Sequence, residues 1–174
     1  MKALILAADG FEDSELLVPM YRLKEEGFEV DVATPTGSKI IGKHGYEVPG
    51  TADLSQVRPD AYDLLVIPGG RGPETVRLEE QAVAATRAMI DGNKIVCVIC
   101  HGAQVLVSAG AVKGRKLTCW MGIRDDVKAA GGEFRDEEVV VDRNLVTSRF
   151  PGDLPAFCRE MMKLVRQRKL APGR

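Results

Sequence analysis

Runs of consecutive apolar residues recur along the chain and are separated by longer amphipathic stretches. Such runs are typical of strands buried on both faces of a parallel sheet, whereas apolar residues spaced three or four apart are typical of helices that cover it. The alternation predicts a βαβ architecture. We expect core strands at 2–8, 28–33, 62–67 and 94–99, and helices at 14–26, 79–91, 102–109, 123–130 and from an N-cap at Asp153 to about 168.

Shorter elements are expected between these segments. The glycine-punctuated residues 34–48 predict a β-hairpin that ends at Pro49, and residues 68–74 predict a loop. The expected fold class is α/β, a three-layer α/β/α sandwich with a mostly parallel sheet. A length of 174 residues without a repeat or linker predicts a single domain over 1–174, with 168–174 as a frayed tail. Further short strands are expected at 116–119, 138–141 and 145–147.

Charge and composition argue against several kinds of partner. The 24 Lys and Arg residues nearly balance the 25 Asp and Glu residues, and aromatic residues make up only 5%, so no nucleic-acid surface is expected. No apolar stretch approaches the roughly 18 residues of a membrane span. The apolar N-terminal run is short and meets Asp9, Glu12 and Asp13, which predicts a buried strand rather than a secretion signal. We therefore expect a cytoplasmic protein.

The chain has four cysteines, which are expected to be free thiols in a reducing compartment. Cys97 and Cys100 match a C-x-x-C pattern, but residues three apart on a strand point to opposite faces and lie roughly 10 Å apart. A disulfide needs Cα atoms within about 7 Å, so we disfavour a redox pair. The two histidines, His44 and His101, are not spaced with the cysteines as zinc ligands. We expect no metal and no cofactor.

A cysteine lies where the buried strand at 94–99 leads into the helix at 102–109. This is the layout of a nucleophile elbow, in which a sharp turn presents the nucleophile at the top of the sheet. The helix N-terminus beside the sulfur of Cys100 favours the thiolate. A buried structural thiol is the alternative, and the elbow layout leads us to favour a catalytic one. His101 is a candidate acid or base, because an unperturbed imidazole titrates near neutrality.

Two other loops are expected to meet this cysteine, because ligands of such sheets bind at the carboxyl ends of the strands. The N–H groups of Gly70 and His101 are candidate oxyanion donors, although a plain glycine turn explains Gly70 equally well. Glu12 and Glu15 follow the first strand, where acids at a helix N-terminus are ordinary. The alternative is that one of the three acids Glu12, Asp13 and Glu15 hydrogen-bonds the sulfur, and their positions alone do not select among them. The converging loops are 9–15, 68–74 and 100–102.

Four motifs resemble those of the PfpI family of intracellular peptidases and protein deglycases, within the class I glutamine amidotransferase-like superfamily. They agree in order and spacing over residues 1 to about 165. The resemblance implies a flavodoxin-like sandwich that acts as a homodimer or a hexamer. The motifs are GFEDSE at 10–15, GKHGY at 42–46, LVIPGGR at 65–71 and ICHG at 99–102.

The resemblance also implies roles for individual residues. Cys100 would be the nucleophile, His101 its partner, and Glu15 the carboxyl that hydrogen-bonds the sulfur. Glu74 matches an acid that family members supply across a subunit interface, and Gly70 with His101 would hold the oxyanion. Glu12 and Trp120 complete the candidate substrate-binding residues. Trp120 stands where relatives usually carry Tyr, so any hydroxyl role is lost there.

The activity that the resemblance implies is cofactor-free chemistry on carbonyl groups. We expect a protein or nucleotide deglycase, or a glyoxalase-type enzyme, that acts on methylglyoxal and its adducts during stress. Its substrates would be small aldehydes or glycated proteins and nucleotides. The alternatives are an intracellular cysteine peptidase and a non-enzymatic redox sensor or chaperone in which Cys100 oxidises.

Overall fold

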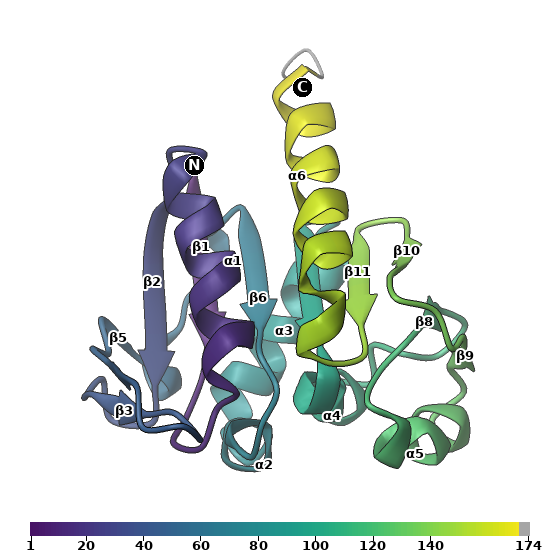
Figure 1. Cartoon of the computed structure of the whole chain (residues 1–174), viewed down its shortest axis with the longest axis horizontal. Coiled ribbons are helices and arrows are strands. Elements are labelled where there is room, and N and C mark those ends of the chain that lie inside the picture. The colour runs from purple at the N-terminus through teal and green to yellow at the C-terminus, as the bar shows by residue number, and fades with distance from the viewer. Residues whose placement is uncertain (171–174) are drawn as a thin grey trace.

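A seven-stranded sheet forms the centre of the computed structural model, which describes residues 1–170. The strand order is β10-β11-β7-β6-β1-β2-β5 (Figure 1). All neighbouring strands are parallel except β10 and β11, which pair in antiparallel register around a tight turn. The strands are β1 (Lys2–Leu6), β2 (Glu29–Thr34), β5 (Ala52–Asp53), β6 (Leu64–Ile67), β7 (Ile95–Ile99), β10 (Val140–Asp142) and β11 (Leu145–Ser148).

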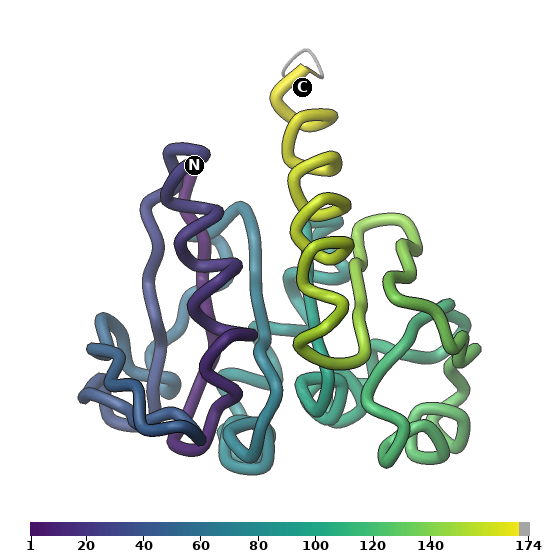
Figure 2. Tube along the Cα trace, viewed as in Figure 1, coloured from purple at the N-terminus to yellow at the C-terminus, as the bar shows by residue number. Residues whose placement is uncertain are grey.

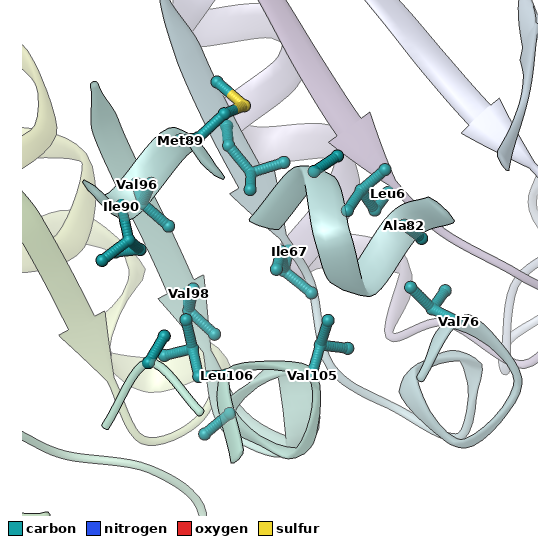
Figure 3. Packing of buried hydrophobic residues seen from close by; sticks show 14 of the residues in the cluster. Leu6, Ile67, Val76, Ala82, Met89, Ile90, Val96, Val98, Val105 and Leu106 are labelled. Carbon is teal, nitrogen blue, oxygen red and sulfur yellow. The ribbon is translucent and has the colours of Figure 1, made fainter. Parts of the chain in front are cut away.

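Helices cover both faces of this sheet, as successive residues of each strand alternate between them. On one face α1 (Asp13–Glu25) and α6 (Leu154–Leu170) pack against Ile5, Val66 and Cys97. Side chains from the other face, such as Ile67, Val96 and Val98, pack against the remaining helices (Figure 3). The expected flavodoxin-like three-layer sandwich is thus confirmed. The remaining helices are α2 (Gly72–Val76), α3 (Glu80–Asp91), α4 (Ala103–Ser108) and α5 (Arg124–Ala129).

The parallel strands give the molecule two distinct edges. The N-terminus and the last turn of α6 lie at the amino-terminal edge of the strands, whereas the chain turns that follow β1 and β6 lie at the opposite edge (Figure 2). Among residues 1–170 no helix is long and apolar enough to cross a membrane.

Several expected elements differ in detail. Residues 68–74 were expected to be a loop, but α2 begins at Gly72, because Pro73 in its first turn has the backbone angle that a helix start needs. Two short strands were missed, β5 and β9 (Glu133–Phe134), which pairs with β8 (Lys116–Leu117). Two residues are too few to show an apolar period.

The start and the end of α6 also differ from expectation. Asp153 was expected to cap the helix, but its carboxylate accepts hydrogen bonds from the Arg149 backbone N–H (3.1 Å) and Nε (2.9 Å). Asp153 therefore fixes the bend before α6 by binding both the backbone and the side chain of Arg149. The helix continues to Leu170, so residues 168–170 are helical rather than a frayed tail. Residues 171–174 lie outside the described part of the chain.

The expected hairpin is confirmed, and a buried carboxylate holds its turn. Strands β3 (Ile40–Ile41) and β4 (Glu47–Val48) pair in antiparallel register. Asp13, in the first turn of α1, accepts hydrogen bonds from the N–H groups of His44 (2.9 Å) and Tyr46 (3.0 Å). Burial alone would raise the pKa of Asp13, but these N–H groups outweigh it and the net pKa is lowered.

Replacing Asp13 by Ala is expected to lower the free energy of unfolding by about 2 kcal/mol, because each of two backbone N–H groups loses a partner at roughly 1 kcal/mol. Denaturant unfolding of the variant and wild type would measure this. The folded-state pKa of Asp13 is lowered, so its contribution should be present at neutral pH and lost on acidification below about 4. The exposed Asp125→Ala serves as control. Equal stability of Asp13→Ala and wild type at pH 7 would contradict the assignment.

Candidate active site

The predicted elbow is present at the carboxyl end of β7. Cys100 has a φ of 60°, a left-handed conformation that is strained for a residue with a side chain. A 3-10 turn at Cys100–Gly102 follows and leads into α4. Gly102 lies directly on β6, because a Cβ there would approach the Ile67 carbonyl oxygen to 2.5 Å. The turn aims the cysteine at the carboxyl edge of the sheet, with 7% of the residue exposed.

The glycine pair after β6 brings Glu15 and Cys100 together. The N–H of Gly69 donates to Glu15 Oε2 at 2.8 Å. A Cβ on Gly69 would lie 2.5 Å from that oxygen and 2.6 Å from Cys100 Cβ, so only glycine fits. Gly70, with a φ of 77°, forms an isolated bridge with Phe11. The pair is therefore more than a plain turn, since it joins the loops after β1, β6 and β7.

Burial dominates the electrostatics of this junction. Burial raises the pKa of Glu15 to about 7, and the charge of Glu12 adds to the shift against the opposing Gly69 N–H. Burial also raises the pKa of Cys100 to about 12, with a further contribution from the Glu15 carboxylate. The N–H groups of His101 and Gly70 act in the opposite direction. The expected lowering by the helix N-terminus is thus outweighed, and the thiolate forms most readily while Glu15 holds a proton.

His101 contacts the sulfur directly, which its position in sequence could not establish. Its Nδ1 lies 3.3 Å from Cys100 Sγ. The imidazole stacks on the Trp120 ring, with centroids 6.0 Å apart and planes at 28°. Burial lowers the pKa of His101, against the opposing charge of Glu74, so the imidazole is neutral at pH 7 and able to accept a proton.

A cavity of about 280 Å³ opens above the thiol, and every candidate site residue predicted from the sequence lines it. Glu74 lines the cavity of its own chain. The sequence interpretation did not assign roles to Lys43, Arg71, Phe150 and Pro151, which also line it. Phe150 follows β11, and the only sequence signal that could have found it is the expected convergence of carboxyl strand ends, which did not single it out. The predicted residues are Glu12, Glu15, Gly70, Glu74, Cys100, His101 and Trp120.

The arrangement is suited to nucleophilic chemistry on a carbonyl. A thiol with a neutral imidazole beside it can act as a nucleophile toward a C=O bond, and the N–H groups of His101 and Gly70 stabilise negative charge on the sulfur. Within residues 1–170 no group of three or more His, Cys, Asp or Glu side chains is placed to hold a metal ion. Fold and site together define an α/β-sandwich protein with a cysteine at a strand–helix elbow.

The chain belongs to the DJ-1/PfpI family, whose sequence model matches residues 1–164. Deglycase TK1284 of Thermococcus kodakarensis is 58% identical over 166 residues, which cover 95% of this chain and 100% of that protein. Deglycase PfpI of Pyrococcus furiosus is 54% identical with the same coverage. A crystal structure from Anabaena variabilis, with DJ-1/ThiJ/PfpI-like and ferritin-like domains, superposes with a TM-score of 0.91 at 34% identity. That match covers 94% of this chain and 48% of the other.

The buried Glu15 predicts a pH-dependent stability. Its pKa rises from 4.5 to about 7 on folding. Between these pH values the unfolded chain has released the proton that the folded chain retains, so stability falls as the pH rises, by about 3 kcal/mol in total. Glu15→Gln keeps the shape without the titration. Its unfolding free energy relative to wild type should therefore increase by about 3 kcal/mol from pH 4.5 to 7.5 and then level off. A difference that stays constant across this range would refute the raised pKa.

Proposed function

We propose that this chain is a cytoplasmic cysteine-dependent enzyme that acts on carbonyl groups, most simply as a deglycase or glyoxalase-type catalyst for methylglyoxal and its adducts. The observation that carries the proposal is the 3.3 Å contact between Cys100 Sγ and His101 Nδ1 beneath a cavity of small-molecule size. The relatives from Thermococcus kodakarensis and Pyrococcus furiosus, both named deglycases, support it.

The proposed reaction begins with a neutral thiol and a neutral imidazole. As the sulfur adds to the carbonyl carbon, an S–C bond forms, the C=O π bond breaks, and the thiol proton passes to His101 Nδ1. The N–H groups of Gly70 and His101 hold the oxyanion. Protonation of the oxyanion from His101 gives a hemithioacetal, with no net oxidation or reduction. Glu15 favours the thiolate while protonated, since its charge then no longer raises the pKa of Cys100.

A peptidase is the other enzymatic candidate, and the dimensions of the cavity argue against it. An extended peptide needs a groove several residues long, whereas the cavity measures about 280 Å³ and has Trp120, Phe150 and Pro151 among its walls. This volume is at the lower limit of pockets that take small molecules. Small carbonyl substrates, or a single glycated side chain, therefore suit the site better.

Replacing Cys100 by Ala is expected to abolish methylglyoxal consumption and lactate formation, because no other group in the cavity replaces the thiol. The change removes one atom at the cavity edge, so circular dichroism and the melting temperature should remain close to wild type. Cys158→Ala, at a buried thiol of α6 that does not line the cavity, is the matched control and should keep turnover. Full activity of Cys100→Ala would refute the proposed nucleophile.

We propose further that the active form is an oligomer in which Glu74 of one subunit completes the site of its neighbour. Glu74 belongs to the short helix α2 at the cavity rim, where its side chain is exposed in the single chain. A carboxylate at that rim is able to orient the His101 imidazole of either chain. Mixing variant subunits distinguishes a Glu74 that acts across the interface from a Glu74 that acts within its own chain.

Subunits that carry Cys100→Ala and subunits that carry Glu74→Ala are each expected to be inactive. If Glu74 acts across the interface, co-refolded mixtures should recover about a quarter of wild-type turnover, because half of the random dimers would contain one intact composite site. If Glu74 acts within its own chain, no mixed dimer contains an intact site. Turnover of methylglyoxal by the mixture decides between them, with each variant refolded alone as control.

A further inference from the structure

A second, strongly basic cavity lies at the opposite edge of the sheet. It has a volume of about 200 Å³ and four cationic side chains in its wall, against the single carboxylate of Asp91. Ile90 and Asp91 end α3 shortly before β7, and Arg143 lies in the turn before β11, so the cavity is at the amino ends of the strands. It is therefore separate from the cysteine site. The four cations are Arg87, Lys113, Arg115 and Arg143.

Arg115 is a buried cation in the wall of this cavity. The residue is only 8% exposed, and in the described part of the chain no carboxylate lies within ion-pair distance of its guanidinium. Its Nη1 donates to two neutral acceptors, the Asp142 carbonyl and Asn144 Oδ1, each at 3.0 Å. Nε and Nη2 make no hydrogen bond to residues 1–170, and Arg115 is one of the residues that line the cavity. A buried guanidinium normally pairs with an anion, because desolvating an unpaired charge is costly.

The surrounding charges do not supply that anion. Asp91 accepts from Arg87 Nε at 2.6 Å, and the Asp142 carboxylate accepts from Arg143 Nε at 3.1 Å and from the Lys116 backbone N–H at 3.0 Å. Each carboxylate therefore already has its own cation. Burial, followed by the charge of Arg143, lowers the pKa of Arg115, and the charges of Asp142 and Asp91 oppose this shift without reversing it. A bound anion would stabilise the charged guanidinium and so offset both the burial of Arg115 and its repulsion by Arg143.

We propose that this cavity binds a phosphate group, with the buried Arg115 guanidinium as its anchor and Arg143 and Lys113 closing over it. A guanidinium presents parallel N–H donors that match two oxygens of a phosphate, and the free Nε and Nη2 of Arg115 have this fork geometry. Lys113 is exposed and has no ion-pair partner among the described residues, so it is free to add a third charged contact. A phosphate monoester fits the same chemistry with its organic part in solvent.

The test is isothermal titration of the full chain with inorganic phosphate and, separately, with AMP, both at constant ionic strength set with sodium chloride. We expect saturable binding of one phosphate group per chain. The double variant Lys113→Gln/Arg143→Gln should bind at least about tenfold more weakly, because two charge-assisted contacts are lost. Arg115 itself is left in place, because replacing a buried side chain would change the stability of the fold as well as phosphate binding.

The matched control is Lys128→Gln/Arg166→Gln, which removes one exposed Lys and one exposed Arg from α5 and α6. It should bind phosphate as wild type does. Binding of phosphate without AMP assigns free phosphate as the ligand, and binding of both assigns monoesters. No saturable binding to wild type, or equal loss in both double variants, overturns the proposal.

Discussion

A fully buried carboxyl group, that of Glu15, lies where three neighbouring strands end. Glu15 lies in the first turn of α1, after β1. Its carboxyl group accepts a hydrogen bond from the Gly69 N–H after β6, and its charge raises the pKa of the Cys100 thiol after β7. Because β1, β6 and β7 are adjacent in the sheet, their carboxyl ends bring these three groups within contact distance without any long loop. The absence of a side chain at Gly69 is what leaves room for the contact.

The same burial determines the chemistry of the cysteine. Removal from water raises the pKa of both acids, and the charge of one raises the pKa of the other, so the pair does not hold two negative charges at neutral pH. A resting neutral thiol is protected from indiscriminate alkylation and oxidation, since the thiolate is the reactive form. In the proposed reaction, the neutral His101, with its Nδ1 3.3 Å from the sulfur, would accept the thiol proton only as an electrophile is attacked.

Much of this was predictable from the sequence, for identifiable reasons. The core strands are continuous apolar runs, and the strand–cysteine–helix order at 94–109 specifies an elbow, so the sheet layers and Cys100 followed from local patterns. Phe150 and Pro151 were missed because they reach the cavity only through the placement of β11 beside β7, a long-range pairing with no local signal. The roles of Glu74 and Glu15 rested on family resemblance, because acids near a helix start are common for other reasons. The direct His101–sulfur contact depends on the left-handed backbone of Cys100.

The charges at the two edges of the sheet favour different ligands. With Glu15 protonated, the cysteine cavity has two carboxylates, Glu12 and Glu74, against two cations, Lys43 and Arg71. A balanced, partly aromatic cavity has no net field to attract an anion, and it suits an uncharged aldehyde or a neutral adduct. The cavity at the other edge has an excess of cations around the buried Arg115. A parallel sheet that exposes different loops at its two edges would therefore keep the proposed carbonyl chemistry and the proposed anion binding apart, because no residue that lines the cysteine site also lines the basic cavity.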